Sequence, residues 1–417
     1  MPRFPKWRST RFRVLLTIFL GLALEDLFHQ YYYHVPRASQ PLDTPFQVGC
    51  REPKTDAPRE NATIIMLARN EDLDSAIATI QSLEDHFNRW FHYPVVFLND
   101  QQWSNEFITK MTETVSGEAK FEVIPSEMFD YPEWINKDDA KASMATQDAN
   151  GIHRGGMESY HHMCRFYSGK FYDVKALKQY KWYWRVEPHV QFYCAITYDP
   201  FVEMAKHGKK YGYTVALWEL DNTVPSLFRL ISDYKKEKRI KTTELWKSMI
   251  NPSWIPFPFR SLLSSQSWRD ASGDAWNLCH YWSNFEIADL DFFRGPEYRE
   301  VFDYLDRNGG FYFERWGDAS VHSLAAALLL EPHQLHHFRD FGYYHDPWIV
   351  CPANARGGQL PNSDVLGSES GKWAEEQDGG IGCRCECEER RNFQSVCFNK
   401  LQKATALEGF APGFNKW

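Results

Sequence analysis

Two apolar runs separated by a segment of helical spacing constrain the fold of this chain most. Residues 63–68 read Thr-Ile-Ile-Met-Leu-Ala, which is typical of a strand buried on both faces. Apolar residues then recur at helical spacing between residues 73 and 87, and residues 93–98 indicate a second strand. A strand, a helix and a strand in this order predict a parallel sheet with a right-handed crossover. We therefore expect an α/β fold.

The same patterns predict the later elements. Ligands bind at the carboxyl ends of strands in parallel α/β sheets, and Asp100 and Glu187 lie at or near such ends. Asp318 is well placed as the N-cap of a strong helix. Residues 240–275 are irregular and contain several prolines. Strands are expected at 121–124, 180–193 and 211–220, and helices at 159–178, 223–239, 296–307 and 318–330.

The N-terminus has the pattern of a secretory-pathway signal. Basic residues precede an apolar run at 14–24, and Glu25 and Asp26 follow it. The run is shorter than the ~20 residues of a relaxed spanning helix, so a cleaved signal peptide remains an alternative. The lack of a clear small-x-small cleavage site favours an uncleaved anchor with its basic flank in the cytoplasm. We expect a cytoplasmic tail and signal-anchor at 1–27, a stem at 28–60 and a lumenal domain with a cysteine-rich tail at 61–417.

Charge and cysteine content narrow the partners and the compartment. The 417-residue chain has a net charge of −8, which does not favour a nucleic-acid surface, because phosphate binding needs concentrated Lys and Arg. Nine cysteines suit the secretory lumen, and the odd number leaves at least one thiol free or paired with another chain. The spacing Cys-x-Cys-x-Cys at 383–387 is too tight to close a zinc site by itself, so disulfides are favoured. Asn61 begins a glycosylation sequon whose use stays open.

Four side chains are candidates for chemistry, and each also has a structural interpretation. Glu187 lies in Arg-Val-Glu-Pro-His after an aromatic strand, where nucleotide-sugar enzymes often hold a divalent cation; a surface pair with Arg185 is the alternative. Glu286 is either a half-exposed strand residue or a buried acid at a functional site. A helix cap is enough to explain Asp318, and His345 is explained as a structural histidine, although each can also serve a site.

Several familiar catalytic motifs do not occur in the sequence. It contains no H-E-x-x-H zinc motif, no G-x-G-x-x-G fingerprint, no P-loop and no G-x-S-x-G elbow. Metalloprotease, dehydrogenase, kinase and serine-hydrolase functions therefore lose support.

Long motifs follow one another in an order that chance explains poorly. Among them are Arg-Val-Glu-Pro-His-Val at 185–190, His-Tyr-Trp-Ser-Asn-Phe-Glu-Ile at 280–287 and Gly-Gly-Phe-Tyr-Phe-Glu-Arg-Trp-Gly-Asp at 309–318. At these motifs the chain resembles the fungal α-1,2-mannosyltransferase family of the Golgi, glycosyltransferase family 15. The resemblance covers roughly residues 60–352. Its other motifs are residues 62–70, 96–100, 159–169, 198–201 and 342–345.

The resemblance implies a GT-A-type fold, with a mixed, mainly parallel sheet flanked by helices. It also implies GDP-mannose as donor and Mn²⁺ as cofactor, with Glu187 and His345 as the metal ligands. Glu286 is then the candidate nucleophile, and Tyr160 and Asp318 contact the reacting or acceptor sugar. The cofactor-binding positions that the resemblance implies are Glu187, Pro188, Arg69 and Asp100.

The function expected from the resemblance is retaining transfer of mannose from GDP-mannose to mannosyl acceptors on N- or O-linked glycans. The protein would be a single-pass type II protein of the Golgi membrane with a lumenal catalytic domain, serving protein glycosylation and the fungal cell wall. Retention can arise by double displacement through Glu286, or by entry of the acceptor on the leaving-group face. A non-catalytic mannoside-binding protein and a retaining glycoside hydrolase are the alternatives. The acceptor class, the disulfide pairing and the oligomeric state stay open.

Overall fold

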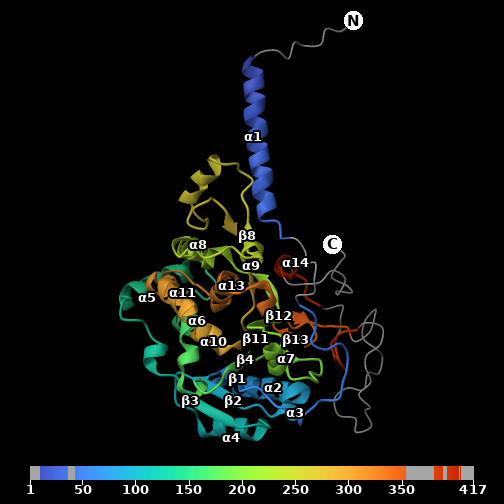
Figure 1. Cartoon of the computed structure of the whole chain (residues 1–417). Helices are drawn as coiled ribbons and strands as arrows, with labels where there is room; N and C mark the ends of the chain where they lie inside the picture. Colours follow the sequence, from blue (N-terminus) through green and yellow to red (C-terminus); the bar gives the residue numbers. More distant parts are fainter. Residues whose placement is uncertain (1–9, 36–42, 354–379, 388–391, 403, 405–417) are drawn as a thin grey trace.

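A seven-stranded sheet is the centre of the computed structural model, which describes residues 10–35, 43–353, 380–387, 392–402 and 404 (Figure 1). Its strand order is β12-β6-β11-β4-β1-β2-β3. Strand β11 runs antiparallel to both of its neighbours, whereas the other neighbouring pairs are parallel. The predicted mixed, mainly parallel sheet is therefore confirmed. These strands are β1 (Ala62–Leu67), β2 (Val95–Asn99), β3 (Ala119–Val123), β4 (Trp182–Val186), β6 (Tyr211–Tyr213), β11 (Glu286–Asp289) and β12 (Leu335–His337).

Smaller sheets accompany the seven-stranded sheet. One is three-stranded, in the order β14-β13-β5, and the pairs β10-β7 and β8-β9 form two others. The run expected as one strand at 211–220 divides into β6 and β7, because β7 leaves the main sheet to pair with β10. The bounds are β5 (Gln191–Phe192), β7 (Ala216–Trp218), β8 (Ile250–Asn251), β9 (Ala275–Trp276), β10 (Cys279–Tyr281), β13 (Tyr343–His345) and β14 (Trp348–Val350).

Helices surround the sheet in two groups (Figure 1). Helices α2, α3 and α4 lie with β1, β2 and β3, whereas α13 packs against α6, α8, α9 and α11. The α-helices are α1 (Thr10–Tyr32), α2 (Leu73–Leu83), α3 (Arg89–Phe91), α4 (Asn105–Thr114), α5 (Lys137–Ala149), α6 (Glu158–Gly169), α7 (Pro200–Lys206), α8 (Leu227–Glu237), α9 (Glu244–Ser248), α10 (Leu290–Arg294), α11 (Pro296–Arg307), α12 (Gly310–Phe313), α13 (Asp318–Leu329) and α14 (Val396–Gln402).

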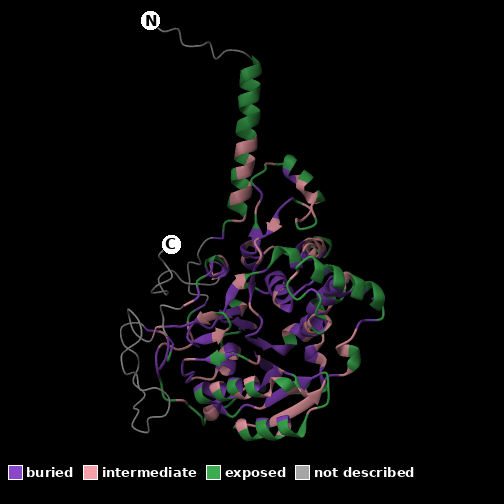
Figure 2. Ribbon diagram, turned by 180° about the vertical axis from the view of Figure 1, so that it is seen from behind, coloured by how far each residue is buried: buried purple, intermediate pink, exposed green. Residues whose placement is uncertain are grey.

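Helix α6 ends earlier than predicted, and helix α13 has a different N-cap from the one predicted. Helix α6 ends at Gly169 instead of reaching residue 178, and a Cβ at Gly169 would overlap the ring of Phe302 on α11. Helix α13 begins at Asp318, so Gly317 is its N-cap and the predicted capping role of Asp318 is wrong. The Asp318 carboxylate instead accepts hydrogen bonds from the side chains of Arg185 and Ser283. Figure 2 shows that the buried residues are concentrated inside the body, and they include Trp182 and Trp184 of β4.

Four disulfides attach the C-terminal segment to the body. The cysteines at 383, 385 and 387 pair with Cys50, Cys194 and Cys351, and Cys279 pairs with Cys397. Disulfides, not zinc, therefore account for the tight cysteine cluster, as favoured from the sequence. Cys164 is the free thiol among the described cysteines, and it is buried.

Helix α1 projects from the body, and its C-terminal half is hydrogen-bonded to the body (Figure 1). Within the described part of the chain, no helix combines the length and the apolar character needed to cross a bilayer. After the undescribed residues 36–42 the chain rejoins the body at Asp43, which is buried. The Asp43 carboxylate bonds to the ring of His336 and lies 3.5 Å from the Lys209 ammonium group. This network attaches the segment after α1 to the edge of the main sheet.

Candidate active site

Three predicted site residues follow neighbouring parallel strands. Asp100 directly follows β2, Glu187 directly follows β4, and Arg69 lies two positions beyond β1, which is between them in the sheet. Parallel strands end at one edge, so these side chains share the carboxyl edge of the sheet. Arg69 and Asp100 are exposed and accessible to a ligand. Arg69 is ion-paired with Asp72, with 2.9 Å between the guanidinium nitrogen and the carboxylate oxygen.

A buried arginine links two of the predicted acids. The Arg185 guanidinium donates to Asp318 Oδ2 at 2.6 Å and to Glu187 Oε1 at 2.5 Å, and it lies 3.4 Å from the centre of the Tyr167 ring. Burial by itself lowers the pKa of Arg185, but Asp318 and Glu187 outweigh it and raise that pKa well above the usual range. The pair of Arg185 with Glu187 that we considered a surface contact is formed, yet the arginine is buried.

Strand pairing brings His345 to Glu187. His345 ends β13, and β13 pairs with β5, which begins four residues after Glu187. The His345 Nε2 and Glu187 Oε2 atoms are 3.8 Å apart, and both side chains are partly exposed. Pro188 continues the turn after Glu187 and is partly buried. Among the residues that the structure describes, no group of three or more His, Cys, Asp or Glu side chains could hold a metal ion.

Glu286 is the centre of a buried hydrogen-bond network. It is 0% exposed. Its Oε1 accepts from the Tyr211 hydroxyl at 2.7 Å and from His322 Nδ1 at 2.6 Å, and its Oε2 accepts from the Tyr183 hydroxyl at 2.6 Å. The other ring nitrogen of His322 lies 2.9 Å from the Tyr167 carbonyl oxygen. Both oxygens of Glu286 are therefore engaged inside the protein.

The hydrogen-bond partners of His322 favour a protonated ring. Both ring nitrogens face oxygens that only accept hydrogen bonds, and only the imidazolium donates from both nitrogens. Burial by itself lowers the pKa of His322, but the Glu286 carboxylate outweighs it and raises the pKa above its usual value. In its protonated form, His322 is ion-paired with Glu286 in the core. Register adds a second cation to this environment, because Arg185 is the direct cross-strand partner of Glu286.

Asp318 and Tyr160 lie on two helices that pack together, α13 and α6. Asp318 Oδ2 accepts from Ser283 Oγ at 2.7 Å as well as from Arg185. Burial raises the pKa of Asp318, but Arg185 and then His322 and Ser283 outweigh it, so the carboxyl group stays ionised. The ring of Tyr160 is flanked by Arg154 and Arg315, whose guanidinium carbons are 4.8 Å and 5.6 Å from its centre.

Most of the predicted residues fall into two clusters, and Arg69 and Asp100 lie separately along the exposed edge of the sheet. In the first cluster, Arg185 joins Glu187 to Asp318, and His345 lies beside Glu187. The second cluster is the buried network of Glu286, which lies behind the first. Sequence reasoning missed the supporting residues, because cross-strand register and helix packing are not visible in local patterns. Those residues are Tyr167, Tyr183, Tyr211, Ser283, Arg315 and His322.

Comparisons with known proteins show which proteins the chain resembles. A model of the glycolipid 2-alpha-mannosyltransferase family matches residues 32–357. The chain is 41% identical over 407 residues to O-glycoside alpha-1,2-mannosyltransferase homolog 4 of Schizosaccharomyces pombe, which covers 91% of this chain and 86% of that protein. It is 44% identical over 300 residues to alpha-1,2 mannosyltransferase KTR1 of Saccharomyces cerevisiae, covering 72% of each chain.

Solved structures extend the likeness to the fold. Core-mannan synthase A of Aspergillus fumigatus, in its Mn/GDP form, is 33% identical with a TM-score of 0.68, covering 90% of this chain and 91% of that one. The mannosyltransferase Ktr4p of S. cerevisiae in complex with GDP is 29% identical with a TM-score of 0.68, covering 94% and 92%.

Proposed function

The chain belongs to the glycolipid 2-alpha-mannosyltransferase family, and from this membership we propose that it is a retaining α-1,2-mannosyltransferase. It transfers mannose from GDP-mannose to a mannose-terminated acceptor. One structural observation carries the proposal: Arg185 joins Glu187 to Asp318, and His345 lies 3.8 Å from Glu187, so residues distant in sequence meet at the carboxyl edge of the sheet. All three lie within the residues that the family model matches.

The pair Glu187 and His345 fits a divalent cation such as Mn²⁺. Carboxylate and imidazole are ligands that Mn²⁺ accepts, and their nearest atoms are 3.8 Å apart and partly exposed. Glu187 and His345 would be the residues that hold the cation. When bound, the cation stabilises the negative charge that develops on the departing GDP.

Arg185 orients the carboxylate for this role. It holds Glu187 Oε1 by a hydrogen bond, while Oε2 faces His345, so Oε2 would be the oxygen that binds a cation together with His345. Partners of metal ligands commonly raise metal affinity by fixing ligand geometry. Because Arg185 also binds Asp318, it couples the metal-binding pair to the residue that we expect at the sugar.

In the transfer, the bond from the anomeric carbon to the phosphate oxygen breaks, and a bond from that carbon to the acceptor oxygen forms. The acceptor proton passes to the departing phosphate oxygen. The burial of Glu286, with both oxygens hydrogen-bonded, supports entry of the acceptor on the leaving-group face over direct attack by Glu286. Glu286 then organises Tyr183, Tyr211 and His322 behind the site.

We assign the acceptor side to Tyr160 and Asp318, and the acceptors to mannose-bearing N- or O-linked glycans. Tyr160 is partly exposed, and its helix packs against the helix that carries Asp318. We place the protein in the Golgi membrane, as a type II protein with a lumenal catalytic domain. The basic residues before the apolar run and the four disulfides support this placement.

The direct test incubates the purified chain with GDP-mannose, Mn²⁺ and a panel of mannosyl acceptors, followed by NMR of the product linkage. We expect an α-1,2 bond and GDP release that stops when the metal is chelated. Cleavage of mannosides without nucleotide would indicate a hydrolase. Mannoside binding without GDP release from any acceptor would indicate a binding protein.

A further inference from the structure

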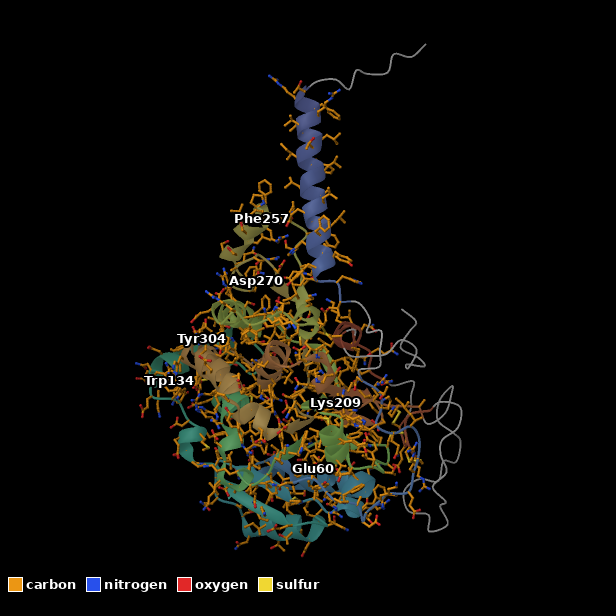
Figure 3. The ribbon with its side chains drawn as sticks, viewed as in Figure 1. Glu60, Trp134, Lys209, Phe257, Asp270 and Tyr304 are labelled. Atoms are coloured by element: carbon orange, nitrogen blue, oxygen red, sulfur yellow. A yellow bond between two sulfur atoms is a disulfide. The ribbon has the colours of Figure 1, made fainter. Side chains whose placement is uncertain are left out.

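An apolar loop lies beside the C-terminal end of helix α1. It comprises residues 252–268, between β8 and β9, and includes the 3-10 helix η7 (Phe259–Ser265). Figure 3 shows Phe257 on this loop, which rises next to α1. The loop exposes large apolar side chains, with Trp254 74% and Leu262 72% exposed. The other exposed large apolar residues of the loop are Ile255, Phe257, Phe259 and Trp268.

The loop carries almost no charge to keep it in water. Arg260 is the only charged residue between 252 and 268, and its guanidinium is buried and donates to Glu25 Oε1 of α1 at 2.9 Å. Monomeric soluble proteins rarely expose large contiguous apolar patches, which usually mark contact with a protein or a membrane. Tryptophan and other amphipathic aromatic residues concentrate where a bilayer meets water.

Hydrogen bonds fix the height of the loop along α1. Glu25 Oε2 accepts from the Phe257 backbone nitrogen at 2.8 Å, and Gln30 donates to the Ser253 carbonyl oxygen at 2.9 Å. Phe257 therefore lies at the level of Glu25, directly after the apolar run at 14–24 ends. No residue of α1 is buried, and that run has apolar residues on all sides of the helix. A helix of this kind needs an apolar environment from outside the chain.

We propose that the loop at 252–268 and the apolar run of α1 form one lipid-contacting surface, with the loop in the interfacial layer of the bilayer at the level of Glu25. The run is about half as long as the ~20 residues of a relaxed span, so a second contact adds apolar area that the helix lacks. The ion pair and hydrogen bonds from Glu25 make the two contacts one unit, and the catalytic body is then held close to the membrane.

The test reconstitutes the full chain into phosphatidylcholine vesicles whose acyl chains are brominated, and measures quenching of tryptophan fluorescence. The variant Trp254→Phe/Trp268→Phe keeps the surface apolar but removes two reporters. We expect the quenched part of the emission to fall by the contribution of these two residues. Trp134→Phe is the matched control, since Trp134 is also exposed, at 51%, but lies on the body away from α1 (Figure 3). It should lower the total emission and leave the quenched part unchanged.

Two outcomes would overturn the proposal. One is equal quenching in the double variant and the wild type. The other is a detergent-solubilised wild-type dimer that Trp254→Ser/Leu262→Ser converts to a monomer, because a second copy would then cover the loop. Mannosyl transfer to a soluble acceptor should be the same in the Phe variant and the wild type. That assay separates failure of this proposal from failure of the proposed activity.

Discussion

Replacing Glu286 by glutamine removes the negative charge at the centre of the buried network and keeps the shape of the side chain. The amide oxygen can still accept from Tyr211 and His322, and the Tyr183 hydroxyl can turn to accept from the new NH₂ group. The imidazolium of His322, however, loses the carboxylate that is hydrogen-bonded to it. His322 must then stay charged without an ionised partner, or lose its proton and leave one ring nitrogen facing an oxygen.

The two responses differ in cost. Breaking a buried ion pair and keeping the charge costs about 3–5 kcal/mol. An unmade hydrogen bond at a buried polar group costs about 1–3 kcal/mol. The protein takes the cheaper response, so we expect Glu286→Gln to fold and to lose about 1–3 kcal/mol of unfolding free energy. Transfer should fall by about 10²-fold, because loss of the charged network shifts the groups that it positions, and a misplacement of about 1 Å can cost this much.

Urea unfolding and initial transfer rates measure the two effects separately. Asp289→Asn is the matched control, because Asp289 is a buried acid on the same strand that is paired with Lys210 at 2.6 Å and caps α10. Asparagine also caps helices, so this variant should lose stability but transfer within a few-fold of the wild type. Glu286→Gln protein with wild-type urea resistance and near-normal turnover would refute the role of this network. Loss of stability alone would restrict Glu286 to a structural role.

Further predictions follow from the same contacts. Arg185→Lys should raise the Mn²⁺ concentration needed for half-maximal transfer about 10-fold or more, because one ammonium group cannot hold both Glu187 and Asp318 as the guanidinium does; unchanged metal dependence would contradict this. Pairing with Glu286 raises the pKa of His322. The pair therefore stabilises the folded protein fully below about pH 6.5, and this stabilisation is lost as the pH rises through the raised pKa. Urea midpoints between about pH 6 and 9 should accordingly decline less in Glu286→Gln than in the wild type. Cys279→Ser/Cys397→Ser should lower the unfolding free energy by about 2–5 kcal/mol, since this disulfide joins residues 118 positions apart; an unchanged urea midpoint would show that the bond adds nothing.

Local patterns were sufficient for the elements whose signals are local. The apolar run that became β1 and the helical spacing of α2 each depend on residues close together in sequence, and α11 has the predicted bounds. The resemblance rested on contiguous motifs, and the family comparison confirms it. Periodicity follows from the geometry of one strand or helix, so it can be recognised without knowledge of the partner.

Tertiary structure decided which of these residues meet. Arg185 contacts Asp318 across 133 positions because α13 packs beside the sheet, and it faces Glu286 because β11 lies antiparallel to β4 in one register. The burial of that arginine, the raised pKa of His322 and the pairing of the cysteines all depend on such contacts. Their energies come from desolvation and from partners supplied by distant segments, neither of which a local pattern encodes.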